Sequence, residues 1–193
     1  MDFAEQFDVI DPSMMLNVLS MLPMLALLVW AAVEDVRTRR IRNWLTFALA
    51  GSGILHSYLS GSPLSPSQAW YGLLAGFAIP FVLFALGALG GGDVKLLAGI
   101  GAWLGPVGAV EVFVVAALVG LVIVLVQCAW QGRLVTLFRN STVLAINMVH
   151  IADVGVKHAT ETGKSCRSVD RPLPYAVPVL IAAAFVVLSS IRP

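Results

Sequence analysis

One stretch, residues 70–97, decides the fold, and it reads WYGLLAGFAIPFVLFALGALGGGDVKLL. Residues 70–89 contain no charge and are long enough to cross about 30 Å of hydrocarbon as an α-helix. Three glycines, Asp93 and Lys95 follow at once, and an ionisable residue at membrane depth normally serves a site, because lipid offers it neither water nor partners. Glycines beside it indicate close packing or unusual backbone dihedral angles. The stretch therefore predicts a membrane helix that ends beside a functional carboxylate.

The composition extends this prediction to the whole chain. Of its 193 residues, 59% are hydrophobic and 12% are charged, and the mean hydropathy is +0.89. A soluble domain carries about 25% charged residues, so we predict an all-α, polytopic membrane protein that forms a single embedded domain, residues 1–193. Six transmembrane helices are expected, over residues 16–33, 44–59, 70–89, 94–104, 106–130 and 175–191. The fourth is short and contains glycines, so it crosses only if it packs against neighbouring helices.

The positive charges predict the orientation. Four arginines lie between Arg37 and Arg42, and six further Lys and Arg residues lie between Arg133 and Arg171. Because basic loops stay on the cytoplasmic side, both segments are expected there, with both termini outside. Residues 131–173 have the loose amphipathic pattern of an interfacial helix and form a predicted cytoplasmic insertion.

Ligand-binding residues are few. Cys128 and Cys166 are too far apart for a zinc site of paired cysteines, and His150 and His158 lack metal-ligand spacing. We therefore expect no metal and no cofactor. The net charge of +1 says little about partners. We expect the lipid bilayer as one partner and no nucleic-acid partner.

Asp93 has a potential partner in Asp35, which follows the first predicted span. Two predicted spans separate the two aspartates, and an even number of crossings returns both to the same side. Two carboxylates in a partly dry site cannot both ionise cheaply, so they share one proton. The charged one can then take a proton from water while the neutral one hydrogen-bonds a carbonyl group under attack, as in aspartic proteases. The dipole of the helix after Asp93 favours its anionic form.

The residues around both aspartates resemble a known family. Gly90-Gly91-Gly92-Asp93 has the Gly-x-Gly-Asp form of intramembrane aspartyl proteases, and its continuation resembles the type IV prepilin peptidases. Two further segments resemble motifs of that family, one at the first aspartate and one opening the last span. The residues that carry these two resemblances are Asp35, Arg37, Arg40, Ile41, Asn43, Trp44, Pro174, Tyr175 and Ala176.

The resemblance implies an aspartic endopeptidase that removes the basic leader of a prepilin or pseudopilin at the cytoplasmic face of the bacterial inner membrane. Asp35 and Asp93 are then catalytic and act without metal. Supporting roles fall to Gly90, Gly91, Gly92, Lys95, Arg37, Arg40, Asn43, Pro174 and Tyr175. Pilus-assembly proteins are further potential partners.

Two departures from the family pattern refine this expectation. Arg42 stands where many relatives have proline, which we expect to be tolerated. The larger relatives carry an N-terminal cytoplasmic region with paired cysteines, which is linked to N-methylation. This sequence reaches its first span almost at once, so it resembles the short, peptidase-only form of Flp/Tad pilus systems, and methyltransferase activity is not expected.

Other interpretations stay open at this point. A small ion or proton-coupled transporter could use Asp35, Asp93 and Lys95 as a relay, although relay carboxylates belong near the midplane. A scaffold subunit of a pilus machine needs neither aspartate. Lys95 either pairs with a carboxylate or stabilises a developing oxyanion, or it extends to the interface. Glu34 is expected in a supporting or surface role.

Overall fold

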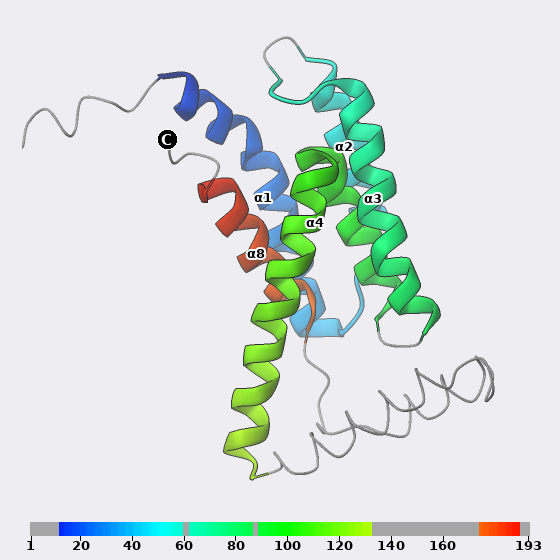
Figure 1. The fold of residues 1–193 in the computed structure, drawn as a ribbon, viewed down its shortest axis with the longest axis vertical. Coiled ribbons are helices and arrows are strands. Elements are labelled where there is room, and N and C mark those ends of the chain that lie inside the picture. The colour runs from blue at the N-terminus through cyan, green and yellow to red at the C-terminus, as the bar shows by residue number, and fades with distance from the viewer. Residues whose placement is uncertain (1–11, 60–61, 87–88, 133–173, 190–193) are drawn as a thin grey trace, which may run out of the picture.

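The computed structural model describes residues 12–59, 62–86, 89–132 and 174–189, and the described part consists of helices and short connections without strands. The all-α prediction is therefore confirmed for these residues (Figure 1). The helices are α1 (Pro12–Thr38), α2 (Asn43–Ser57), α3 (Pro66–Ala85), α4 (Gly91–Trp130) and α8 (Ala176–Ser189). From residue 133 on, the predicted insertion 131–173 lies outside the described residues.

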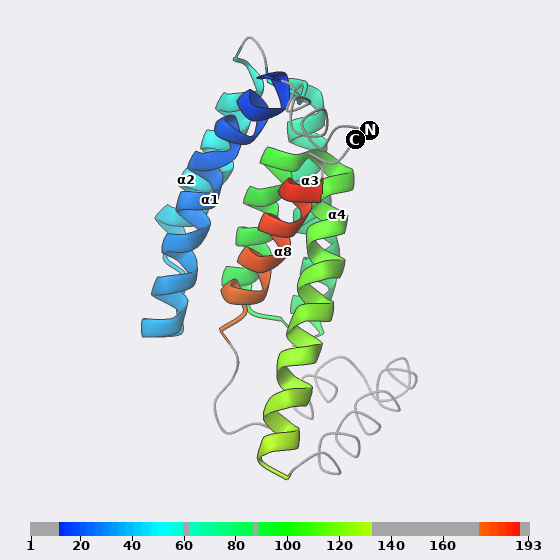
Figure 2. The ribbon, with the colours of Figure 1, turned by 90° about the vertical axis from the view of Figure 1, so that its left-hand side faces the viewer.

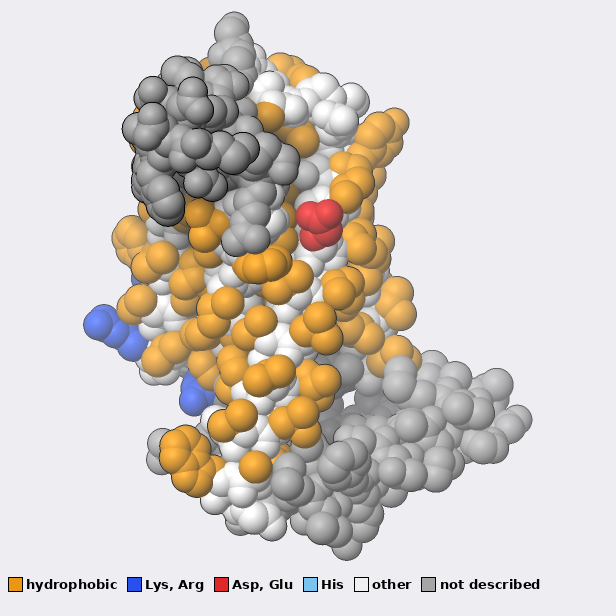
Figure 3. All heavy atoms as spheres, turned by 60° about the vertical axis from the view of Figure 1, so that its left-hand side comes forward, with side chains coloured by type: hydrophobic (Ala, Val, Ile, Leu, Met, Phe, Trp, Pro, Cys, Tyr) orange, Lys and Arg blue, Asp and Glu red, His pale blue; other side chains and the backbone are white. Residues whose placement is uncertain are grey.

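Among the described residues, three segments are long and apolar enough to cross a membrane: Leu19–Thr38, Pro66–Ala85 and Gly91–Trp130. The shorter helix α8 is also apolar. Large hydrophobic side chains cover much of the outer surface, as Figure 3 shows for one face. An apolar surface of this kind is favourable in contact with lipid and unfavourable in contact with water. The chain is thus a helical membrane protein, whereas the number of six crossings stays a prediction.

Helix α4 is sharply broken at Gly105. A straight helix of its 40 residues would measure about 60 Å, twice the hydrocarbon thickness. Gly105 has φ 74° and ψ −178°, a conformation that is essentially restricted to glycine, and Pro106 follows it. A Cβ atom on Gly101 would lie 3.3 Å from the Cβ of Ala109, so the chain folds back there. Figures 1 and 2 show the two resulting arms, which carry the predicted spans 94–104 and 106–130 in one helical element.

Several helix boundaries differ from the prediction for local reasons. Helix α3 begins at Pro66, because Ser65 and Gln68 form a capping box that satisfies its first free N–H groups. Helix α4 begins at Gly91, with Gly90 as its N-cap. Asp93 was expected just before this helix, and that placement was wrong. It is the third residue of the helix, in the first turn.

The core forms around the first arm of α4, between α3 on one side and α1, α2 and α8 on the other (Figure 2). Glycines allow α3 and α4 to approach closely, since Gly72 lies against the backbone of Gly101 and Gly105, and Gly76 lies against that of Leu97. The opposite side is filled by buried aliphatic side chains, among them Met24, Leu28, Leu49, Ile100, Val112 and Val179. This packing holds the end of α1 beside the beginnings of α4 and α8.

Candidate functional site

Asp35 lies in the last turn of α1 and is only 7% exposed. Its Oδ2 atom accepts a hydrogen bond of 3.2 Å from the backbone N–H of Ala176, the first residue of α8. The first N–H groups of a helix have no partner within it and carry the positive end of its dipole. The beginning of α8 therefore orients and stabilises the Asp35 carboxylate.

Asp93 reaches the same region from the first turn of α4. Its carboxylate turns back to the N-cap and accepts a hydrogen bond from the backbone of Gly90. A Cβ atom on Gly90 would lie 2.8 Å from Asp93 Oδ2, so a glycine leaves the space that this arrangement needs. The negative charges of Asp35 and Asp93 act on each other across this space. Asp35 and Asp93 come from helices that are far apart in the sequence, and they are close enough for their charges to interact.

The segment before α8 contributes a third side chain. The charge of Asp93 also acts on the hydroxyl group of Tyr175, a half-buried residue. The carbonyl oxygens of Pro174 and Tyr175 accept hydrogen bonds of 3.3 Å from the N–H groups of Val177 and Val179. These bonds begin α8 and hold Tyr175 within range of the charge of Asp93.

The remaining glycines of the predicted motif have different surroundings. A Cβ atom on Gly91 would lie 3.3 Å from the Phe84 ring, which is a tight contact. On Gly92 it would lie 3.5 Å from Ile41, an ordinary van der Waals distance, so packing does not demand glycine there. The expectation of close packing therefore applies to Gly90 and Gly91 but not to Gly92.

Two other predicted residues meet at the edge of the site. Lys95 Nζ donates a hydrogen bond of 3.0 Å to Asn43 Oδ1, which links the beginnings of α4 and α2. Arg37 instead lines an apolar groove of about 250 Å³ between α1 and α8. Arg40 is exposed, and its carbonyl oxygen accepts a hydrogen bond from the Thr38 hydroxyl. Within the described ranges, neither arginine forms an ion pair.

Sequence reasoning missed two features of the site. One is the backbone N–H of Ala176, which carries no side-chain signal. The other is Glu34, which is buried and forms an ion pair with Arg42, with 2.7 Å between Oε1 and Nε. The short spacing between a Glu and an Arg across a turn was the available signal. Among the described residues, no group of three or more His, Cys, Asp or Glu side chains could hold a metal ion.

The fold and the site define a class, a helical membrane protein that carries two aspartates near the ends of its helices. Residues 22–125, more than half of the chain, match the model of the Type IV leader peptidase family. The chain therefore belongs to the Type IV leader peptidase family.

Curated relatives agree with this membership. A prepilin leader peptidase/N-methyltransferase of Pectobacterium carotovorum is 39% identical over 116 residues, which cover 56% of this chain and 40% of that protein. A preflagellin peptidase of Methanococcus maripaludis is 36% identical over 78 residues, covering 39% of this chain and 34% of the relative. A type 4 prepilin-like proteins leader peptide-processing enzyme of Escherichia coli is 31% identical over 104 residues, which cover 50% of this chain and 39% of that protein.

The matched region covers about 40% or less of the length of these relatives. No solved structure matches the chain.

Proposed function

We propose that this protein is an aspartyl endopeptidase that removes the N-terminal leader from prepilin-like proteins, with Asp35 and Asp93 as its catalytic pair. The observation that carries the proposal is that Asp35, which is held by the Ala176 N–H, is close enough to Asp93 for their charges to interact. Membership of the Type IV leader peptidase family and the names of the relatives support the same substrate class.

The proposed chemistry follows from the unequal surroundings of the two carboxylates. They repel each other, so a single proton shared between them lowers the energy of the pair. The ionised carboxylate takes a proton from a water molecule, which attacks the scissile carbonyl carbon. The protonated carboxylate donates a hydrogen bond to the carbonyl oxygen and stabilises the charge that develops there. The C–N bond then breaks, and the leaving amine receives a proton from the pair.

Tyr175 and Lys95 have proposed supporting roles. Tyr175 is half-buried, and its hydroxyl group lies within the field of Asp93 and can orient the water or the substrate carbonyl. Lys95 holds the beginning of α4 to that of α2 through Asn43 and so fixes the turn that carries Asp93.

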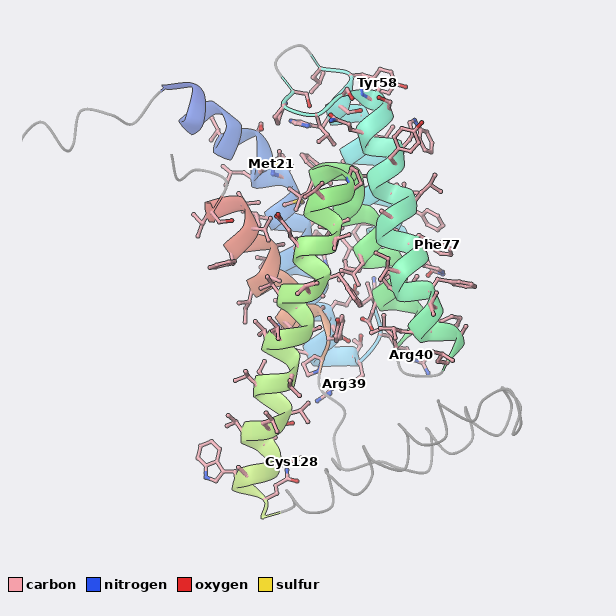
Figure 4. The ribbon with its side chains drawn as sticks, in the orientation of Figure 1. Met21, Arg39, Arg40, Tyr58, Phe77 and Cys128 are labelled. Atoms are coloured by element: carbon pink, nitrogen blue, oxygen red, sulfur yellow. The ribbon has the colours of Figure 1, made fainter. Side chains whose placement is uncertain are left out.

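We place the site at the cytoplasmic face of the inner membrane. Arg39 and Arg40 lie at the end of the bundle where α1 meets α2, the end that also carries Asp35 (Figure 4). Basic residues at one end of a membrane bundle favour a cytoplasmic location for that end. Both carboxylates are within about two turns of helix ends, whereas a transport relay belongs near the midplane. This position favours a peptidase over the alternative of a proton-coupled transporter.

Co-expression with a prepilin tests the proposal. Leader removal is followed by a gel shift for the wild type and for the variants Asp35→Asn and Asp93→Asn, which keep the side-chain volume but cannot share a proton. Glu111→Gln is the matched control, because Glu111 is an exposed carboxylate on the second arm of α4.

Each aspartate variant is expected to lose leader removal, with the protein still in the membrane fraction, and the control is expected to retain it. Processing by both aspartate variants at the wild-type rate contradicts the peptidase mechanism.

A further inference from the structure

Glu34 precedes Asp35 directly and is buried to a similar degree, with 8% and 7% exposed. A carboxylate in such a position is unfavourable unless a counter-charge or hydrogen bonds compensate it. The compensation comes from Arg42, whose Nε lies 2.7 Å from Glu34 Oε1, while the other oxygen, Oε2, is buried without a hydrogen-bond partner among the described residues. The two partners differ in their exposure to solvent, because the side chain of Arg42 is 67% exposed and that of Glu34 is 9% exposed.

The ion pair spans the connection between α1 and α2. Glu34 lies in α1, and Arg42 is the N-cap residue of α2. Thr38 reinforces the same turn, because its hydroxyl contacts the carbonyl oxygens of Glu34 and Arg40 at 2.9 and 3.0 Å. Arg39 has a φ of 56°, a left-handed conformation that only a minority of non-glycine residues adopt. A turn with this dihedral angle needs contacts that hold it in place.

We infer that the Glu34–Arg42 ion pair is a positioning element for Asp35, which keeps its carboxylate on the N–H of Ala176 and toward Asp93. The catalytic part of this inference rests on the proposed function. The physical reason is that loss of Arg42 leaves Glu34 buried without a counter-charge, so its side chain must move toward water. Asp35 follows it on the same helical turn and moves away from α8.

The backbone at Arg42 indicates how the turn can be held without charge. Its φ is −68°, which lies within the range that a proline ring imposes. Its carbonyl oxygen accepts a hydrogen bond of 3.1 Å from Leu45 N–H, and a proline keeps that carbonyl. A proline here fixes the turn through the ring, whereas this chain fixes it through the ion pair.

Four variants separate positioning from a general effect of charge. Glu34→Gln and Arg42→Gln each break the ion pair, and Arg39→Gln removes an equally exposed cation from the same turn without touching it. The double variant Glu34→Gln/Arg42→Pro removes both charges and restores the fixed φ. All are compared in detergent for thermal unfolding, leader-removal kinetics, and hydrogen exchange of peptides that contain the Ala176 amide.

We expect Glu34→Gln and Arg42→Gln to lower kcat by up to about 100-fold, the cost of a catalytic group displaced by about 1 Å, with KM nearly unchanged. The Ala176 amide should exchange faster in both, because its hydrogen bond to Asp35 is weakened. Arg39→Gln should resemble the wild type, and Glu34→Gln/Arg42→Pro should regain most of kcat and the slow exchange.

The hydrogen-exchange measurement does not depend on catalysis. Unchanged exchange at Ala176 in both single variants overturns the positioning role, whatever happens to activity. Equal losses in Arg39→Gln and Arg42→Gln overturn it too, since they indicate a general effect of charge. If Asp35→Asn and Asp93→Asn retain activity, the proposed function fails, and faster exchange in the single variants still supports the structural part of the inference.

Discussion

Lys95 Nζ lies 3.0 Å from Asn43 Oδ1 and joins the beginning of α4, which carries Asp93, to the beginning of α2. The sequence left three roles open for this lysine, which are pairing with a carboxylate, stabilisation of an oxyanion and extension to the membrane interface. The hydrogen bond adds a further role, in which Lys95 acts through Asn43 to hold the two helix ends together.

A double-mutant cycle separates these roles. Lys95→Met and Asn43→Ala should each lower the free energy of unfolding by about 1 kcal/mol, because each removes the same partly exposed, charge-assisted hydrogen bond. The double variant should be no less stable than the worse single variant, which corresponds to a coupling energy of about 1 kcal/mol. If Lys95 contacted the substrate directly, Lys95→Met would reduce kcat far more than Asn43→Ala does.

The role of Asp35 in stability can be separated from its proposed role in catalysis. Asp35→Ala leaves the buried N–H of Ala176 without an acceptor, which costs about 1–3 kcal/mol. Asp35→Asn keeps an acceptor oxygen and also relieves the repulsion with Asp93. We therefore expect Asp35→Ala to unfold at a lower temperature than the wild type, and Asp35→Asn to unfold at the same or a higher temperature.

Thermal unfolding in detergent provides the measurement, with Glu111→Ala as the control for loss of an exposed carboxylate. Both Asp35 variants are expected to be inactive, so activity alone cannot distinguish them. Equal stability of Asp35→Ala and Asp35→Asn would contradict a structural hydrogen bond from Ala176.

Much of the site could be predicted because its signals lie in side chains. Asp35 and Asp93 stand out as carboxylates beside apolar runs, and crossing parity placed them on one side before any contact was known. The all-α class followed from hydrophobic runs of span length. Predictions failed where the deciding contact involves the backbone or distant packing. The N–H of Ala176 has no sequence signature, and the position of Asp93 inside α4 depends on Gly90 acting as the N-cap.

The burial of Glu34 shows a second limit. Helical geometry places neighbouring side chains about 100° apart, so Glu34 was expected in a supporting or surface role beside Asp35. The structure buries both, because α2 returns across the end of α1 and Arg42 supplies the counter-charge. The helix that carries Glu34 could not show which of these two roles applies, because the deciding counter-charge comes from the turn that follows it.

The close packing of α3 against α4 predicts that one methyl group added at their contact strongly lowers the stability of the protein. A Cβ atom on Gly101 would clash with the backbone carbonyl of Gly72, which cannot move as a flexible side chain does. Gly101→Ala should therefore lower the free energy of unfolding by about 3 kcal/mol or more and reduce the yield of folded protein. Gly51→Ala is the matched control, since its new methyl group meets nothing within 4 Å.

The control should be neutral or should stabilise α2 by about 0.5–1 kcal/mol, because alanine loses less conformational entropy in a helix than glycine does. The two variants are compared by thermal unfolding in the same detergent. Similar behaviour of Gly101→Ala and Gly51→Ala would show that the two helices can separate at low cost.

Trp103 supplies the last prediction, on the link between α2 and the first arm of α4. Its ring is 2% exposed, stacks on His56 with 4.8 Å between centroids, and donates from Nε1 to the carbonyl oxygen of Leu49 at 2.9 Å. That carbonyl also accepts a hydrogen bond from the Ser52 hydroxyl, so Trp103→Phe does not leave it unpaired. The loss should therefore be moderate, about 1–2 kcal/mol from the missing hydrogen bond and the smaller ring.

Trp130→Phe is the control, because Trp130 is 88% exposed, and its change should stay within about 0.5 kcal/mol. Trp103→Phe combined with Ser52→Ala should cost more than the sum of the single changes, since the Leu49 carbonyl then loses both side-chain donors. Strict additivity in thermal unfolding would mean that the two donors do not compensate for each other at this carbonyl.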